Sequence, residues 1–253
     1  MIQSLTHKVR TRRANRQLGG LLAFVAGATN AGGFLAIQRY TSHMTGIVSE
    51  IADNLVLGNL MLGAAGLAAL LAFTTGAATT AVLVNWARRR GLHSEFAFSL
   101  MLEAVLLLLF GLLGANLNAL LHVFLPATVL VLSFIMGLQN AIVTKISKAE
   151  IRTTHVTGIV TDLGIELGRL IYWNRAPEAN RTHYVQADRD KLAIHASILG
   201  LFFAGGLAGA LAFHRAGFIA TVPLALVLCA VAAPPLWRDI RDRWALLNRV
   251  QGR

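Results

Sequence analysis

Two octets in this sequence carry hydroxyl, imidazole and glycine residues in the same order. Residues 41–48 read TSHMTGIV and residues 153–160 read TTHVTGIV, so six of the eight letters agree. Threonine before glycine favours a helix start, where the hydroxyl caps a free backbone N–H. A helix start also presents its positive dipole end to an anionic or hydroxyl-bearing group. We therefore predict Thr45 and Thr157 as helix N-caps. The solute-binding candidates in the octets are Thr45, Gly46, Thr157 and Gly158.

Amide side chains precede both octets, within otherwise apolar runs. The stretch AGATNAGGF contains Asn30, and MGLQNAIVT contains Gln139 and Asn140. Amides inside a membrane helix need partners, which they commonly find on a neighbouring helix. We include these three residues among the solute-binding candidates, with interhelical hydrogen bonding as the alternative.

Acidic and histidine residues are few, and several are paired in sequence. Carboxylates that share one helix face near a cavity can exchange protons or coordinate a cation. The alternative for these pairs is water-exposed salt bridging to Arg39 or Arg169. Histidine can bind a proton near neutral pH, but neither octet histidine has a second ligand at i+3 or i+4, so no metal site is predicted. The candidates for proton or ion coupling are His43, Glu50, Asp53, Glu103, His155, Asp162 and Glu166.

Long apolar runs must position these residues. The chain is 55% hydrophobic and 14% charged over 253 residues, whereas soluble domains carry about 25% charge. About 20 helical residues cross the hydrocarbon of a bilayer, and a backbone in lipid must satisfy its own hydrogen bonds. We therefore predict an all-α polytopic membrane protein. Its six expected spans are residues 18–38, 60–85, 96–120, 127–146, 193–213 and 218–236.

The octets belong to a longer internal duplication. TSHMTGIVSEIADNL aligns with TTHVTGIVTDLGIEL, and each octet follows one predicted span and precedes two more. Three spans per unit is an odd number, so the second unit enters the membrane from the opposite side. The sequence therefore predicts two inverted repeats, residues 18–121 and 127–236, within a single membrane domain. Inverted repeats are frequent in secondary transporters. Residues 46–57 and 158–170 are too short to span and are expected as interrupted or interfacial helices.

The net charge of +11 follows a topological pattern. The tail at residues 1–17 holds five Lys/Arg, residues 88–90 hold three, residues 145–192 hold eight, and the segment after residue 236 holds five. Lys and Arg concentrate on the cytoplasmic side of inner-membrane proteins, so both termini are expected there, as basic tails 1–17 and 237–253. Only Arg39 and Arg215 fall on the other side. Since topology accounts for the charge, we expect no nucleic-acid partner.

Motifs of the common enzyme classes do not occur in the sequence. There is no phosphate-binding glycine loop, CxxC, HExxH or GxSxG, and Cys229 is the single cysteine. We predict that the protein is not an enzyme and uses no cofactor. A lipid-modifying enzyme is the weighed alternative, but it would need the histidines on one side, and the inverted repeat separates His43 from His155.

The paired motifs NAGGFLAIQRYTSHMTG and GLQNAIVTKISKAEIRTTHVTG resemble the YoaK-like family of bacterial inner-membrane proteins. The resemblance covers about residues 18–235. It implies a multi-pass protein of the bacterial inner membrane and no established substrate. Asn30 stands where that family often has Asp, and Ile47 stands where it often has Asn, so selectivity is expected to differ if these positions touch a solute.

The leading functional prediction is a secondary-type transporter of a small polar or anionic solute. The solute would bind near the membrane midplane, between the amides and Thr-Gly pairs of the two halves. The alternative is a non-transporting membrane scaffold or sensor partner that buries the octets as packing. The expected partners are the lipid bilayer, an unidentified solute and a second copy of the chain.

Overall fold

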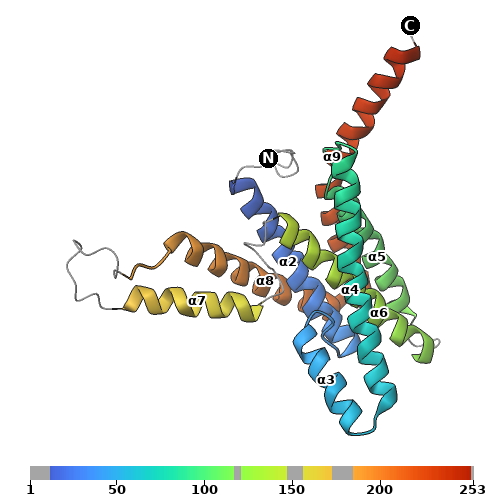
Figure 1. Ribbon diagram of the computed structural model, residues 1–253. Coiled ribbons are helices and arrows are strands. Elements are labelled where there is room, and N and C mark those ends of the chain that lie inside the picture. Colours follow the sequence, from blue (N-terminus) through green and yellow to red (C-terminus); the bar gives the residue numbers. More distant parts are fainter. Residues whose placement is uncertain (1–11, 117–120, 147–155, 173–184, 252–253) are drawn as a thin grey trace.

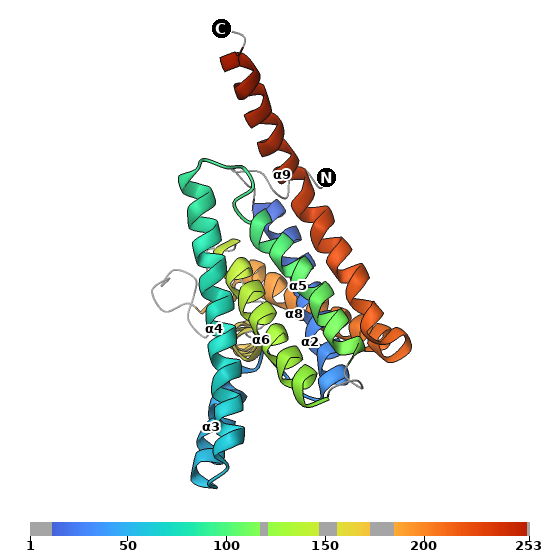
Figure 2. The ribbon, with the colours of Figure 1, turned by 90° about the vertical axis from the view of Figure 1, so that its right-hand side faces the viewer.

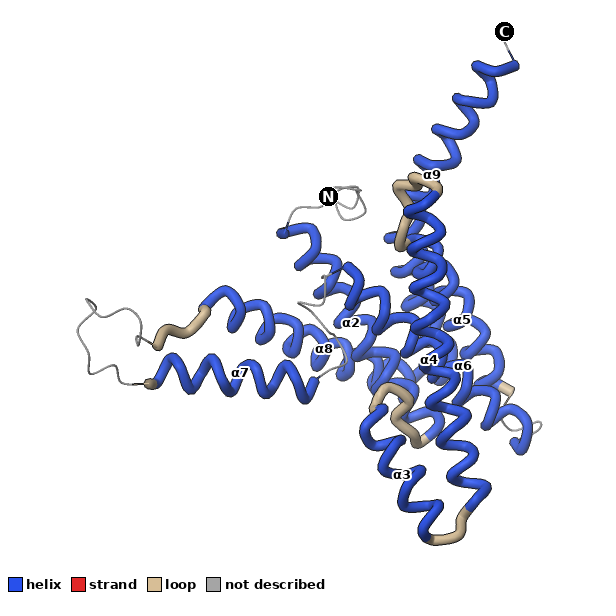
Figure 3. Tube along the Cα trace, viewed as in Figure 1, coloured by secondary structure: helices blue, strands red, loops and turns tan. Residues whose placement is uncertain are grey.

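The computed structural model describes residues 12–116, 121–146, 156–172 and 185–251, and within these ranges it is helical, with no strand (Figures 1 and 3). The all-α prediction is confirmed. The helices are α2 (Arg12–Ile37), α3 (Met44–Val56), α4 (Leu60–Arg89), α5 (Ala97–Ala115), α6 (Leu121–Ile146), α7 (Val156–Ile171), α8 (Arg189–Ala216), the 3₁₀ helix η2 (Gly217–Ala220) and α9 (Thr221–Gln251).

Five helical stretches in the described residues are long and apolar enough to cross a membrane. They are Arg16–Leu35, Leu60–Arg89, Ala97–Ala115, Phe124–Lys145 and the 56 residues Arg189–Trp244. The last stretch contains α8 and most of α9, which correspond to the fifth and sixth predicted runs. Large apolar side chains of α4, such as Leu71 and Val82, are exposed. Exposed apolar side chains on such helices suit contact with lipid.

Glycines bring α2 and α8 into backbone contact. A Cβ added at Gly27 would collide with the carbonyl group of Phe202, and one added at Gly205 would collide with that of Phe24. Gly209 lies equally close to Ala28. Small residues spaced along these two runs therefore mark a close helix–helix contact of the kind that membrane helices commonly use.

Helices α4 and α6 approach each other in the same way. A Cβ at Gly76 would collide with the Phe134 carbonyl, and one at Gly137 with the Phe73 carbonyl. Thr80 extends this contact by donating its hydroxyl to the Leu138 carbonyl at 3.0 Å. Helices α5 and α9 pack against each other beside these pairs (Figure 2). The bundle core thus contains two glycine-mediated helix pairs together with the α5–α9 pair.

The short helices form hairpins with the long helices that follow them. Helix α3 packs on α4, and α7 packs on α8. The α7–α8 hairpin projects sideways from the bundle in Figure 1, and the α3–α4 hairpin extends from its lower end. The predicted short helices at 46–57 and 158–170 are confirmed, with observed bounds of Met44–Val56 and Val156–Ile171.

Asp239 joins α9 to the turn between α4 and α5. Its carboxylate accepts backbone N–H bonds from His93 and Ser94, each at 2.9 Å, and Oδ1 lies 3.1 Å from Nδ1 of His93. Only 8% of Asp239 is exposed. Hydrogen bonds to a charged group contribute about 1.5–3 kcal/mol each. This carboxylate therefore fixes the start of α5 against α9.

We expect Asp239→Asn to lower the free energy of unfolding by about 1–3 kcal/mol, because the amide keeps the shape and loses the charge that these donors face. Asp242→Asn is the matched control, since Asp242 is exposed on the same helix. Thermal unfolding of the detergent-solubilised variants provides the comparison. Equal unfolding midpoints for the two variants would contradict the role given to Asp239.

Candidate functional site

A cavity of about 780 Å³ lies between the C-terminal end of α2 and the N-terminal parts of α3, α4 and α6. Small-molecule sites usually enclose about 300–1,000 Å³. Its walls include residues of the first octet and the segment just before it, together with α6 from the second predicted repeat. Of the predicted site residues, the cavity is lined by His43, Gly46 and Glu50.

One wall of the cavity carries charge. The guanidinium Nη1 of Arg39 donates to Oε1 of Glu50 at 3.0 Å, and both side chains are nearly half exposed. His43 and Thr41 lie in the same wall, and Ser133 lines the cavity from α6. Glu50 therefore forms the water-exposed salt bridge that was the alternative to ion coupling, with Arg39 as its partner. The remaining lining is mainly apolar, from Phe34, Tyr40, Ile47, Met61, Leu62, Leu125, Val129 and Leu130.

The turn after α2 places this wall. Gln38 has a φ of 55°, in the left-handed region that non-glycine residues seldom adopt, and it ends the helix. The rings of Phe34 and Tyr40 then stack with centroids 4.2 Å apart. Ser42 donates to Oδ1 of Asn30 at 2.6 Å, which ties the first octet to α2. Asn30 thus anchors the octet and does not itself line the cavity.

The predicted threonine N-caps are wrong. Helix α3 begins at Met44, its N-cap is His43 and no side-chain cap bond forms. Helix α7 begins at Val156, which places Thr157 inside the helix. The physical reason in the first octet is the His43 ring, which covers the first turn: a Cβ on Gly46 would lie 2.5 Å from its Nδ1. Glycine at position 46 leaves room for that ring.

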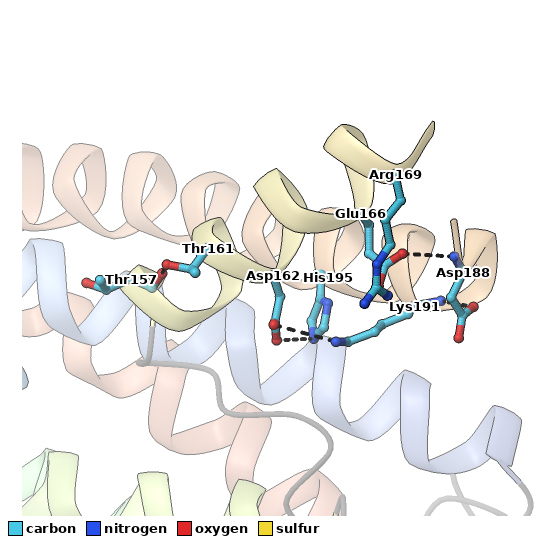
Figure 4. A network of polar contacts seen from close by, with 8 residues as sticks. All are labelled: Thr157, Thr161, Asp162, Glu166, Arg169, Asp188, Lys191 and His195. Carbon is cyan, nitrogen blue, oxygen red and sulfur yellow. Dashed lines mark hydrogen bonds and ion pairs between the residues drawn. The ribbon is translucent and has the colours of Figure 1, made fainter. Parts of the chain in front are cut away.

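The second octet leads into an ion-pair network between α7 and α8 (Figure 4). Glu166 is 1% exposed, accepts from Arg169 at 2.9 Å and accepts the backbone N–H of Asp188 at 2.9 Å. Asp162 lies 3.5 Å from Lys191 and 3.8 Å from Nε2 of His195. These contacts hold the hairpin together. Arg169 is the partner that the salt-bridge alternative named, but Glu166 is buried rather than water-exposed, and Asp162 pairs with Lys191 and His195.

The two Thr-Gly pairs occupy different settings. Gly46 lines the cavity, while Thr45 on the same helix is exposed. Thr157 and Gly158 are exposed on α7 and do not line the cavity. His155, the counterpart of His43, lies outside the described residues. The structure therefore brings first-half octet residues to the cavity and leaves the described part of the second octet away from it.

A separate polar pair lies inside the bundle. Glu103 of α5 and Gln139 of α6 are both 0% exposed, and Nε2 of Gln139 donates to Oε1 of Glu103 at 2.7 Å. Asn140 is also buried, on the neighbouring face of α6, and Asp53 is exposed on α3. Among the predicted amides, Gln139 therefore takes the interhelical role that was the alternative to solute contact.

Three residues of these sites were not among the predicted site residues. Arg39 was considered only as a salt-bridge partner for a carboxylate, although its position outside the basic segments could have indicated a site residue. Ser133 is a lone hydroxyl in an apolar run, and nothing in the sequence singled it out. His195 was not among the predicted site residues, yet it is 5% exposed and lies 3.8 Å from Asp162, because α7 packs on α8.

Within the described ranges, no group of three or more His, Cys, Asp or Glu side chains is positioned to hold a metal ion. The arrangement instead offers a cation and a carboxylate on one wall of a largely apolar cavity. Such a wall can orient a solute with an ionised group by hydrogen bonds from the guanidinium.

Together these features define an all-helical membrane-type protein with a mixed polar and apolar cavity among its long helices. Residues 18–233 match the family model described as "Protein of unknown function (DUF1275)", and the chain belongs to this family. No curated protein and no solved structure matches the chain.

Proposed function

We propose that this protein is a secondary-type transporter of a small solute that carries an ionised group. The observation that supports this most is the 780 Å³ cavity, because it combines the Arg39–Glu50 pair with apolar walls inside a bundle of membrane-length helices. Glu50 occupies one N–H of a guanidinium that has five. The remaining donors can bind a carboxylate or phosphate of the solute.

The proposal includes six membrane crossings arranged as two inverted repeats. Exchanging the halves relates α2 to α6 and α4 to α8, so the α2–α8 contact corresponds to the α6–α4 contact. Both contacts are made by glycines against backbone carbonyls, and both short helices pack on the long helix that follows. Such reciprocal packing is what a pseudo-two-fold axis produces, and transporters of this kind alternate access by moving one half against the other.

The proposed location is the bacterial inner membrane, with both termini in the cytoplasm. The distribution of Lys and Arg supports this orientation, and the likeness to the YoaK-like family is part of the same proposal. In this orientation the cavity opens on the side opposite the termini, since it lies at the C-terminal end of α2.

Uptake into liposomes tests the proposal. Wild-type protein is reconstituted and screened against small carboxylates, phosphates and zwitterions, with and without an imposed proton gradient. For any solute taken up, Arg39→Gln is expected to lower uptake at limiting concentration by about 10- to 100-fold, which corresponds to the loss of about 1.5–3 kcal/mol of charge-assisted bonding.

Arg215→Gln is the matched control, because Arg215 is exposed at the end of α8 and does not line the cavity. It is expected to take up solute at the wild-type rate. If uptake by Arg39→Gln equals that of the control, the cavity is not part of the transport path. Thermal unfolding of both variants should match wild type, because exposed ion pairs contribute only about 0–1 kcal/mol.

A scaffold is the second candidate function, and the α7–α8 hairpin favours it. This hairpin projects from the bundle (Figure 1) and exposes Ile165, Leu170 and Ile171 on α7.

The two functions differ in whether water and solute enter the cavity. In a Cys229→Ala background, Ala65→Cys places a thiol in the cavity wall. A transporter predicts labelling by small aqueous thiol reagents and protection by the solute, whereas a scaffold predicts no protection by any solute.

A further inference from the structure

The Glu103–Gln139 pair contains two oxygens that receive no hydrogen bond from the described residues. Nε2 of Gln139 donates to Oε1 of Glu103 at 2.7 Å. Oε2 of Glu103 and Oε1 of Gln139, the second polar atoms of the same two planar groups, have no hydrogen-bond partner in the described part of the chain. Both residues are 0% exposed. Leaving buried acceptors unpaired costs about 1–3 kcal/mol each, so this arrangement calls for an additional donor.

We propose that Glu103 is a proton-binding site, in which a proton on Oε2 is donated to Oε1 of Gln139. The carboxylic acid and the amide then form a closed pair with two hydrogen bonds. Nε2–H of Gln139 donates to Oε1 of Glu103, and the O–H of Glu103 donates to Oε1 of Gln139. One proton from water bonds to a lone pair of Oε2, and no other covalent bond is made or broken. A single proton thus satisfies both orphaned oxygens.

Among the residues that the structure describes, none supplies a cation that could pair with Glu103 instead of a proton. No described Lys, Arg or His forms an ion pair with it, and η2 carries no ionisable residue. On α6, Lys145 lies six residues beyond Gln139, about 9 Å along the axis. On α4, Arg88 pairs with Glu95. On α9, Cys229 contacts Met101. Asp239, also on α9, binds His93 and Ser94. Among the side chains that the structure describes, the other ionisable residues on these helices are Arg89, Arg238, Arg241, Asp242 and Arg243.

A role in coupling rests on the proposed transporter function. Glu103 belongs to the first half and Gln139 to the second, so the pair joins the halves that would move against each other. Ser133 lines the cavity, and Gln139 lies six residues further along α6, about 9 Å. Proton loss would leave a carboxylate buried with one donor, which is costly in an apolar interior. Proton release would therefore accompany separation of α5 from α6.

Infrared spectroscopy of the purified protein tests the proton site without any solute. At neutral pH, the wild type is expected to show the carbonyl stretching band of a protonated carboxylic acid, shifted by exchange into heavy water. Glu103→Gln should lose this band, because a glutamine pair keeps the shape and two hydrogen bonds but has no acid. Glu50→Gln should retain it. Absence of the band from the wild type, its persistence in Glu103→Gln, or its loss on adding sodium ions would overturn the proton site.

Liposome uptake tests the coupling role. With a solute identified for the wild type, uptake by Glu103→Gln is expected not to respond to an imposed proton gradient, whereas wild-type uptake rises. A response equal to wild type would overturn the coupling role. If the wild type transports nothing, the proposed function fails, and the infrared result still decides the proton site.

Discussion

Gly205→Ala is expected to lower the free energy of unfolding by about 1–3 kcal/mol or more, since it places a methyl group inside a helix–helix contact. The new Cβ would collide with the carbonyl oxygen of Phe24 on α2 and would lie 2.7 Å from the carbonyl carbon. These atoms are backbone, so no rotamer change relieves the overlap. The two helices must separate, and neighbouring contacts such as Gly27 with Phe202 would loosen with them.

Gly200→Ala on the same helix provides the matched control. A Cβ at Gly200 meets no other atom within 4 Å, so the substitution adds no clash. Alanine is favoured over glycine in a helix interior by about 0.8–1.0 kcal/mol. The two variants, five residues apart, should therefore change the thermal unfolding midpoint in opposite directions. Equal changes would show that the α2–α8 contact is looser than described.

The close helix contacts were predictable as features, but their partners were not. The spacing of Gly27 with its small neighbours, and of Gly205 with Gly209, indicates where backbones approach. Such spacing indicates that another helix can approach closely, but it does not identify which helix that is. The structure pairs α2 with α8 and α4 with α6, each joining elements far apart in the sequence. Partner choice depends on the packing of the whole bundle, which periodicity does not encode.

The candidate site was predictable in part. The first octet and the two residues after it place His43, Gly46 and Glu50 near one another, because they share one short helix and its N-terminal end, a local relation that sequence spacing defines. Ser133 joins them from a distant helix, so only tertiary packing brings it to the cavity. The threonine N-cap prediction failed for a local reason as well: the His43 ring covers the first turn of α3, and the helix begins before the threonine.

The different roles of the two octets suit the proposed inverted repeat. In a transporter that alternates access, one half is open while the other is closed, so equivalent residues differ in setting within one conformation. Glu50 faces the cavity and pairs with Arg39 beside it, while its counterpart Asp162 is engaged with Lys191 and His195 on α8. We expect the opposite conformation to free Asp162 from α8 and to close the cavity around Arg39.

The second large effect is expected at the buried pair, where Gln139→Leu should lower the free energy of unfolding by about 1–3 kcal/mol. Leucine fills the space but removes the one donor of the Glu103 carboxyl group, which is 0% exposed. Glu103→Leu should cost a similar amount, because it leaves the amide of Gln139 unpaired. Thermal and denaturant unfolding in detergent would measure both.

The double variant Glu103→Leu/Gln139→Leu is expected to be more stable than either single variant, because replacing both partners of a buried polar pair leaves no unsatisfied group. The coupling energy follows from the double-mutant cycle. Independent sites add within about 0.3–0.5 kcal/mol, so additive losses would show that the pair makes no joint contribution. A double variant that folds stably but takes up solute without responding to a proton gradient would separate the two roles of the pair: its contribution to packing is replaceable by leucine, whereas proton binding requires the carboxyl group.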